Sequence, residues 1–456
     1  MGGNVCTDLR LSADRGLCDG VTVNRDLSLC ADDDLGFDAQ WALAPLTVAT
    51  SRASNATVLQ ADGSLATVGN NVPAVNGMTY VGGAFDDAGL IVSSAVKARF
   101  GLSKVYSEAP YLLCEGSATN LALHSEDFTS TWFPGGTPTS TITANATTAP
   151  DGADTADKIE YALAGARVTQ SITVAAGVTD YTFSVYCKEG SGDGTRLFVY
   201  GTSGSIKAAS YPNVSAGEPS ANGFYRLSVT VNEADGTGFS AGDTLVFYIY
   251  TDSSSGSVAG SYVYAWGAQI EAGVHATSYI PTGGATATRA AAISVPCDMG
   301  GSVLTPAQLG FGSCLYGEVV VNPRLPVISG TAGNAITCTG SGVSIAVSVY
   351  NTGQVKMAVV PNSGLPIAQS TKVVSNGDTV TIRFFWDAAK QQHGISVDGE
   401  PWVVTANSAS FVIPSAVAIG SSPTGSGYLA GRYELGRFRT YASRQEAIIK
   451  GEWHDL

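Results

Sequence analysis

The sequence has 456 residues, more than one hydrophobic core usually serves, so we expect two to four domains. Its 24 basic and 38 acidic residues give a formal net charge of −14, which argues against a nucleic-acid partner because a phosphate backbone would be repelled. Hydrophobic residues make up 44% of the chain, which argues against disorder, and no apolar run approaches the ~20 residues that a membrane-spanning helix needs. The start, MGGNVCTDLRLSADRGL, lacks a signal-peptide pattern, so we expect synthesis in the cytoplasm without export.

Residues 1–40 contain a short internal repeat. Cys6, Cys18 and Cys30 are twelve residues apart, and the segments LRL, VTV and LSL alternate as short strands do. A fixed period indicates stacked strand-turn units, which are too small to be stable alone. We therefore assign this segment to assembly or attachment. The alternative is a chance periodicity in a stretch of low complexity.

The next region, residues 41–118, has the pattern of short strands and turns. Asp62-Gly63 is a strong turn dipeptide, and the apolar run at Tyr111–Leu121 is broken by Gly116. We interpret this stretch as a β-rich connecting region.

Residues 119–290 show the clearest strand pattern. In the runs Asp180–Lys188, Phe224–Val231 and Asp243–Tyr250, successive side chains alternate between two faces. Strands of this spacing, separated by Gly, Ser and Asp turns, predict a β-sandwich. Residues 278–297 hold two prolines and many small residues, which predicts a linker to the next unit.

The last unit, residues 298–456, repeats the strand pattern. Asp398-Gly399 predicts a hairpin turn, and only Arg444–Trp453 has helical composition. The strand candidates are Gly317–Val321, Val343–Val349, Val355–Val360, Asp378–Trp386, His393–Val397 and Trp402–Val404. The sequence therefore predicts an all-β fold: two β-sandwich domains preceded by a small β-rich N-terminal segment.

Few residues of the chain suggest catalysis. None of the eight cysteines forms a C-x-x-C pair and only four histidines are present, which argues against a zinc site or a redox motif. We expect most cysteines to act as small apolar core residues. No nucleophile elbow, zinc-protease motif or P-loop occurs, so we expect a protein that is not an enzyme. Acidic pairs such as Glu126-Asp127 leave glycoside hydrolysis as the enzymatic alternative.

Aromatic residues in the alternating runs suggest a sugar site. If residues such as Phe183 and Phe247 fill the core, the residues that alternate with them along each strand face outward. A sugar stacks its apolar ring face on flat aromatic rings, while its hydroxyls need polar neighbours. The candidate ligand-binding residues are Tyr186, Tyr200, Tyr248 and Tyr250 on outer faces and Trp132 in a predicted loop. Two alternatives stay open: ordinary strand composition, and packing against a neighbouring subunit.

Residues 48–292 resemble a widespread family of structural proteins from tailed phages and prophages. The resemblance rests on the runs TSRASNATVLQADGSL, YLLCEGSATNLALHSEDF, YTFSVYCKEG, GFYRLSVTV and, most specifically, WGAQIEAGVHATSYIPTGGATATRA. The family joins a short lead-in to a jelly roll similar to carbohydrate-binding modules. The unit at 298–456 looks more loosely like a laminin-G or concanavalin-A-like sandwich, on the runs IRFFWDAAKQQHGISVDGEPW and YELGRFRTYASRQEAIIKGEW.

The resemblance implies a virion component at the particle surface: a fibre, spike or decoration protein that contacts other virion proteins and attaches to host surface glycans. Such proteins are usually built on closed symmetry, so we expect a homo-oligomer, most simply a trimer. Fold analogy also implies a structural Ca²⁺, with Glu126, Asp127 and Glu271 as candidate ligands. The alternative is a secreted carbohydrate-binding or polysaccharide-degrading protein.

Overall fold

The computed structural model describes residues 47–441 except 78, 82–83, 88–89, 93–97, 100–110, 136–138, 162–166, 192–194, 202–205, 211–213, 235–237, 252–258, 298–313, 327–329, 341–342, 361–366, 388–389, 408–415, 423–426 and 430. These residues form strands and the short 3-10 helices η2 (Val214–Ala216) and η3 (Ala221–Gly223), and none of them lies in an α-helix. The all-β prediction is confirmed. None of the described helices could cross a membrane. The predicted repeat at 1–40 and the helical segment Arg444–Trp453 lie outside the described residues.

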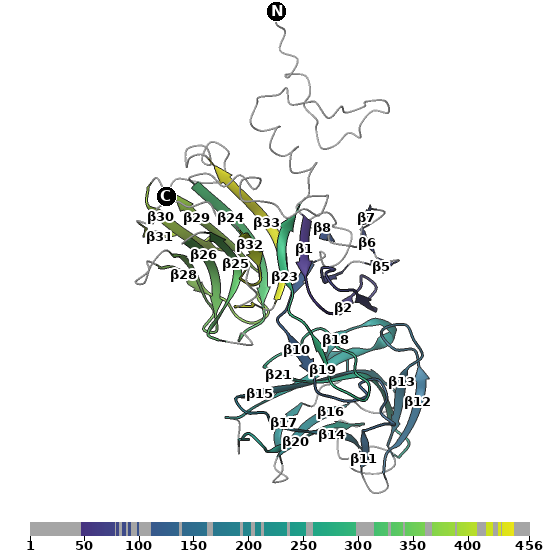
Figure 1. The fold of residues 1–456 in the computed structure, drawn as a ribbon. Helices are drawn as coiled ribbons and strands as arrows, with labels where there is room; N and C mark the ends of the chain where they lie inside the picture. The colour runs from purple at the N-terminus through teal and green to yellow at the C-terminus, as the bar shows by residue number, and fades with distance from the viewer. Residues whose placement is uncertain are drawn as a thin grey trace, which may run out of the picture.

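The jelly roll in the middle of the chain consists of two facing sheets (Figure 1). We call the sheet farther from the rest of the molecule the distal sheet. Its strands, in spatial order, are β11 (Phe133–Gly135), β14 (Arg167–Thr173), β20 (Thr244–Tyr250), β16 (Arg196–Gly201) and β17 (Ile206–Ser210). The proximal sheet contains β12 (Thr141–Thr147), β13 (Ala156–Glu160), β21 (Tyr262–Ala272), β15 (Asp180–Glu189), β19 (Tyr225–Asn232) and β18 (Glu218–Pro219).

The core of the jelly roll follows from strand alternation. In β20 every second residue is buried, so that Leu245, Phe247 and Ile249 point inward. Phe247 meets Phe183 of β15 edge to face, with ring centroids 5.5 Å apart. Both were expected in the core, and the burial of these side chains confirms it.

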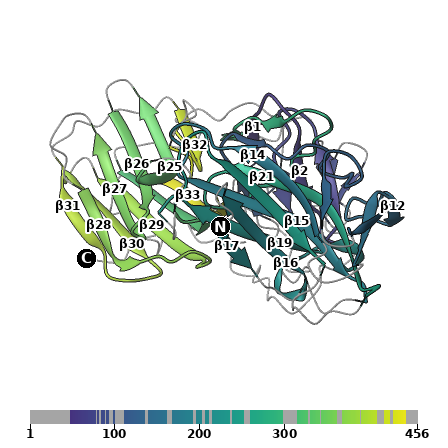
Figure 2. The same cartoon turned by 90° about the horizontal axis from the view of Figure 1, so that it is seen from below.

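The C-terminal sandwich also has two sheets, which lie beside the jelly roll in two views (Figures 1 and 2). One contains β28 (Ile367–Val373), β27 (Gln354–Val360), β26 (Val343–Tyr350), β25 (Ala332–Gly340), β32 (Ala416–Ile419), β23 (Ile293–Cys297), β1 (Thr47–Ser51) and β8 (Ala98–Arg99). The other contains β31 (Val403–Ala406), β30 (Gln392–Val397), β29 (Val380–Asp387), β24 (Cys314–Pro323), β33 (Gly431–Tyr441), β9 (Tyr111–Cys114) and β4 (Val75–Asn76).

Strands from both sides of the jelly roll complete this second sandwich. β1 pairs with β23 along its whole length, and β9 pairs with β33. Val75 and Leu112 belong to the same buried core as Val319 and Ile345. Much of the stretch predicted as a connecting region therefore builds the C-terminal sandwich, and the predicted linker contains two strands. The reason is that pairing between distant segments leaves no local trace in a sequence.

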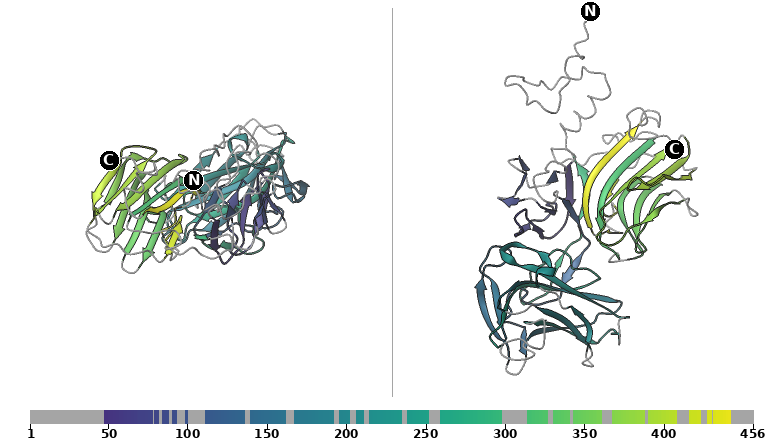
Figure 3. Two further views of the ribbon diagram at one scale, coloured as in Figure 1. Left: turned by 90° about the horizontal axis from the view of Figure 1, so that it is seen from above. Right: turned by 180° about the vertical axis from the view of Figure 1, so that it is seen from behind.

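Three smaller sheets surround the junction of the two sandwiches. The hairpin β2 (Ala56–Leu59) and β3 (Leu65–Val68) turns at Asp62-Gly63, where Gly63 has φ +81°, a conformation that favours glycine. A second sheet joins β5 (Thr79–Val81), β6 (Ala84–Asp87) and β7 (Leu90–Val92). The third is a ribbon of β10 (Ala118–Asn120) and β22 (Ala287–Arg289), through which the chain enters and leaves the jelly roll (Figure 3).

The local predictions for the last unit agree with the structure. All the strand candidates fall on β24, β26, β27, β29, β30 and β31. Asp398 and Gly399 both have positive φ, 50° and 79°, as the predicted hairpin turn requires. Cys114, Cys187 and Cys338 are buried free thiols, as expected of apolar core residues.

Candidate functional site

The candidate site is the outer face of the distal sheet, where aromatic side chains from neighbouring strands stand side by side. Strand register sets the arrangement: Tyr248 of β20 lies opposite Phe198 of β16, and Tyr200 of β16 lies opposite Val246 of β20. Side chains directly opposite one another on antiparallel strands have Cβ atoms about 4.5–5.5 Å apart. The outward-facing side chains of the three adjacent strands β14, β20 and β16 therefore form one continuous surface.

Four rings of this surface touch one another, and we call Phe198, Tyr200, Tyr248 and Tyr250 the aromatic platform. Tyr200 and Tyr248 meet edge to face with centroids 4.6 Å apart, and Phe198 and Tyr250 do so at 5.1 Å. Tyr248 and Tyr250 lie nearly parallel, 14° apart at 5.9 Å. Such contacts are each worth about 0.5–1.5 kcal/mol beyond area burial, so the rings hold one another in place.

Two arginines frame the platform. Arg167 of β14 and Arg196 of β16 both lie opposite Tyr250 in the strand register. The guanidinium carbon of Arg196 is 4.9 Å from the centre of the Tyr250 ring, and that of Arg167 is 5.4 Å from the Tyr248 ring. The face thus joins flat apolar rings to planar hydrogen-bond donors.

The tyrosines of the platform remain partly open to solvent. Tyr200, Tyr248 and Tyr250 are each of intermediate exposure, while Phe198 beneath them is 4% exposed. Burial raises the pKa of Tyr250 to about 12, and the nearby Arg167 opposes that shift. The hydroxyl of Tyr250 is therefore a hydrogen-bond donor at neutral pH. Phe133 of β11, 69% exposed, extends the apolar surface beyond Thr169.

The structure corrects the placement of Tyr186. It is on the outer side of the proximal sheet, as the alternation predicts, but its side chain is 5% exposed. It packs against Trp266 and Tyr279, with centroids 5.6 and 6.1 Å away, in a cluster that also contains Leu65 of hairpin β2–β3. Hairpin β2–β3 covers this part of the outer face, where Leu65 packs with the three rings. Tyr186 instead lines a junction cavity of about 490 Å³.

Trp132 lies in a loop, as predicted, but its ring is not available to a ligand. Its ring is 3% exposed and packs on Phe128 and Phe183 in the jelly-roll core. Its indole N–H donates to the carbonyl oxygens of Leu123 and His124, both at 3.2 Å. A large apolar ring next to a strand folds inward because burying it is worth about 1.5–3 kcal/mol.

The carboxylates predicted to bind calcium do not form one site. Glu271 is 1% exposed and accepts hydrogen bonds from the Thr277 amide at 2.5 Å and hydroxyl at 3.0 Å. Burial raises the pKa of Glu271, although Arg226 opposes the shift. Glu126 instead accepts a hydrogen bond from the Tyr279 hydroxyl at 3.0 Å.

Asp127, the third of these carboxylates, caps a turn. It accepts hydrogen bonds from the Thr129 amide at 2.9 Å and the Ser130 hydroxyl at 2.5 Å. Within the residues that the structure describes, no three His, Cys, Asp or Glu side chains gather as metal ligands would. The predicted ligands are used for hydrogen bonds inside the protein.

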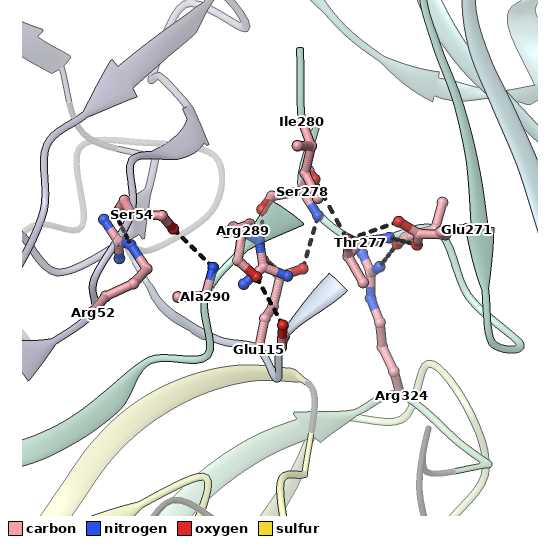
Figure 4. Close-up of polar contacts among 12 residues, drawn as sticks. Arg52, Ser54, Glu115, Glu271, Thr277, Ser278, Ile280, Arg289, Ala290 and Arg324 are labelled. Carbon is pink, nitrogen blue, oxygen red and sulfur yellow. Dashed lines mark hydrogen bonds and ion pairs between the residues drawn. The ribbon is translucent and has the colours of Figure 1, made fainter. Parts of the chain in front are cut away.

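The junction between the sandwiches is held by buried charges (Figure 4). Glu115, just after β9, lies 3.4 Å from Arg289 at the end of β22. It also accepts hydrogen bonds from the Ser278 amide at 2.8 Å and hydroxyl at 2.6 Å. Both charged side chains are at most 6% exposed, so the pair is shielded from solvent. This pair ties the segment after β9 to the closing segment of the jelly roll.

Arg52 adds a second buried cation to the junction. Its guanidinium donates to the carbonyl oxygens of Ser54 and Gly69, both at 2.9 Å. Burial, together with the charge of Arg289, lowers the pKa of Arg52 to about 10. The Ser54 hydroxyl in turn accepts a hydrogen bond from the Ala290 amide at 2.8 Å. The arginines of the SRAS and ATATRA runs are thus structural.

The candidate ligand-binding residues predicted from the sequence did not include the two arginines of the distal face, although Arg196 alternates with Phe198 and Tyr200 in the sequence. Arg167 and Arg196 are the first residues of their strands, RVTQSIT and RLFVYG, where an alternating pattern has just begun. The one available signal was position: each arginine is an even number of residues from the outward-facing side chains of its own strand.

Comparisons with known proteins give no family. No family model matches the chain, and no curated protein matches it. Among solved structures, the IT-sialidase CBM40 of Ruminococcus gnavus is 15% identical over 30% of this chain and 82% of its own, with a TM-score of 0.24. Domains LG4-5 of the mouse laminin alpha1 chain are 11% identical over 58% and 84%, with a TM-score of 0.23. A pentraxin from Limulus polyphemus is 12% identical over 27% and 62%, also at 0.23. At these scores the likeness carries no functional argument, and the fold assignment rests on the strand pairing above.

Proposed function

We propose that the jelly roll binds carbohydrate through the aromatic platform. The observation that supports this is a set of three partly exposed tyrosine rings that contact one another and Phe198, with hydroxyl groups and two guanidinium groups close by. A sugar offers the matching chemistry, because its ring face is apolar while its hydroxyls need hydrogen bonds.

We further propose that the chain is a fibre, spike or decoration protein of a tailed-phage or phage-like particle, attaching it to host surface glycans as a homo-oligomer. The resemblance of residues 48–292 supports this setting. One stacked sugar contributes about 1–2 kcal/mol, so a single module should bind with a Kd near the millimolar range. Many copies on one particle would raise the effective affinity by about 10²–10⁴ without new contacts.

The experiment that tests carbohydrate binding is the double substitution Tyr248→Ala with Tyr250→Ala. We expect it to reduce adsorption of particles to host cells without unfolding the domain, with no more loss of thermal stability than the removed ring contacts explain. The matched control is Tyr262→Ala with Tyr264→Ala on the proximal sheet, where the rings also meet, at 5.3 Å. That control should leave adsorption intact.

A different outcome would favour packing against a neighbouring subunit. In that case the double variant at Tyr248 and Tyr250 would change the oligomeric state or lose thermal stability, and adsorption would fall only as a consequence. Unchanged adsorption with an unchanged melting temperature would remove the platform from the function.

The particle assignment has its own test. A mass-spectrometric inventory of purified particles should contain this chain at the copy number of a surface protein. Recovery only as free protein in the medium would favour the alternative, a secreted carbohydrate-binding or polysaccharide-degrading protein.

A further inference from the structure

The charge of the distal face differs from that of the whole protein. The three adjacent strands β14, β20 and β16 carry two arginines and no acidic residue, in a chain whose formal net charge is −14. Both arginines flank the same ring, Tyr250. The open aromatic platform is therefore a locally basic surface on an acidic molecule.

The spacing of the two cations suits one sugar residue and its substituents. Neighbouring strands lie about 4.7–4.9 Å apart, so Arg167 and Arg196 stand roughly 10 Å apart across Tyr250. Their guanidinium carbons are 5.8 and 4.9 Å from the centre of that ring. Because both guanidinium groups lie over this ring, a sugar stacked on the neighbouring tyrosines of the platform would meet planar donor groups beside it.

Guanidinium groups match carboxylates in particular, because two parallel N–H groups can donate to the two oxygens. Long-range repulsion by the acidic protein is weak at the site, since charges beyond about 8 Å are screened at physiological ionic strength. The electrostatic potential at the site is therefore set mainly by the two nearby arginines and is positive.

We propose that the distal face selects acidic saccharides, with the sugar ring on the tyrosines and a sugar carboxylate on Arg167 or Arg196. This inference rests on the proposed carbohydrate binding and narrows it to one class of ligand. Hexuronic acids and sialic acids both present the required carboxylate.

The proximal sheet offers an internal comparison that supports the assignment. There Tyr264 lies opposite both Lys158 and Lys188. Lysine lacks the planar fork of arginine. The two arginines of the distal face therefore match a carboxylate better than the two lysines of the proximal face do.

The test compares a matched pair of probes on the full chain: tetragalacturonate and its fully methyl-esterified form, titrated by isothermal calorimetry or NMR. Esterification removes the charge and keeps the sugar rings. We expect the unchanged protein to bind the acid about tenfold more tightly than the ester, and the preference to weaken at high salt. In the double variant Arg167→Gln with Arg196→Gln the ratio should fall below about twofold.

Two controls keep the result interpretable. The ratio of the two probes is measured within each folded sample, so a partial loss of folded protein does not change it. The double variant Lys158→Gln with Lys188→Gln should keep the tenfold preference. A second probe pair, 3′-sialyllactose and lactose, extends the test to a sialic acid carboxylate.

The outcomes separate the two proposals. Equal binding of acid and ester, lost in the variant Tyr248→Ala with Tyr250→Ala, would overturn the acidic ligand and keep carbohydrate binding. A preference that survives loss of both arginines would also overturn it. Absence of binding to all four probes and to a panel of neutral oligosaccharides would overturn both proposals.

Discussion

The two outer faces of the jelly roll share a sequence pattern and differ in what covers them. Each has a tyrosine opposite a cation on both neighbouring strands: Tyr250 between two arginines on the distal sheet, and Tyr264 between two lysines on the proximal sheet. On the proximal side, Tyr186, Trp266 and Tyr279 continue the aromatic surface beneath the lead-in hairpin and are buried. The distal side has no such cover among the described residues (Figure 1). Whether an outward-facing aromatic residue is a ligand candidate or a core residue thus depends on whether a segment far away in the sequence packs over it.

The largest expected difference between the faces is in stability. Trp266 is 1% exposed, and its indole N–H donates to the Thr155 hydroxyl at 3.0 Å. Trp266→Ala should lower the free energy of unfolding by about 3–5 kcal/mol, because it opens a cavity between the jelly roll and the lead-in. Chemical denaturation followed by fluorescence measures this. A loss below about 1 kcal/mol would mean that the proximal face is not a core.

The next effect concerns the charges that hold this cover in place. Glu115→Gln should cost about 1.5–3 kcal/mol, since it leaves Arg289 buried without its counter-charge, while the remaining carbonyl oxygen can still accept from the Ser278 amide. The matched control is Glu160→Gln on the proximal sheet, whose partner Lys158 is far more exposed. That control should change stability by less than about 1 kcal/mol. Equal losses in the two variants would contradict a buried junction.

Acid should weaken the same junction. Burial favours the neutral form of Glu115, but Arg289 and Ser278 outweigh it, so the pKa of Glu115 is lowered in the folded protein. A lowered folded-state pKa adds stability above the unfolded value, near 4.5, and that stability is lost as pH falls through the folded value. We expect the stability difference between the unchanged protein and Glu115→Gln to shrink below about pH 4.5. A difference that is constant from pH 7 to pH 3 would contradict this assignment.

The smallest expected effect is on the distal face. Tyr248→Ala should lower the free energy of unfolding by the value of its lost ring contacts and by no more than about 1 kcal/mol in addition. The reason is that the side chain is partly solvated in the folded state. Thermal melts of Tyr248→Ala and Trp266→Ala under one set of conditions make the comparison direct. A large loss for Tyr248→Ala would show that the distal face is also covered, for example by another subunit.

Local patterns in the sequence predicted which way side chains face. The alternation in DTLVFYIY correctly placed Phe247 inside and Tyr248 outside. The same reasoning put Tyr186 on the outer side of its sheet, which is right, but could not show that hairpin β2–β3 covers it. Trp132 was misplaced because loops carry no periodicity from which inward direction can be read.

Long-range pairing accounts for the rest of what the sequence did not predict. β1 and β23 lie on opposite sides of the jelly roll in the chain and pair over five residues. Neither strand has a sequence pattern that indicates which strand it pairs with. The sequence therefore predicted β1 as part of a connecting region and β23 as part of a linker. The buried pair of Glu115 and Arg289 arises from the same closure.

The ribbon of β10 and β22 has a mechanical consequence. Because Ala118 and Arg289 are register partners, the jelly roll begins and ends at one point of the molecule. The segments on either side are already joined to each other by strand pairing of β1 with β23 and of β9 with β33. Tension between the two ends of the chain would therefore pass through the C-terminal sandwich and leave the jelly roll unloaded.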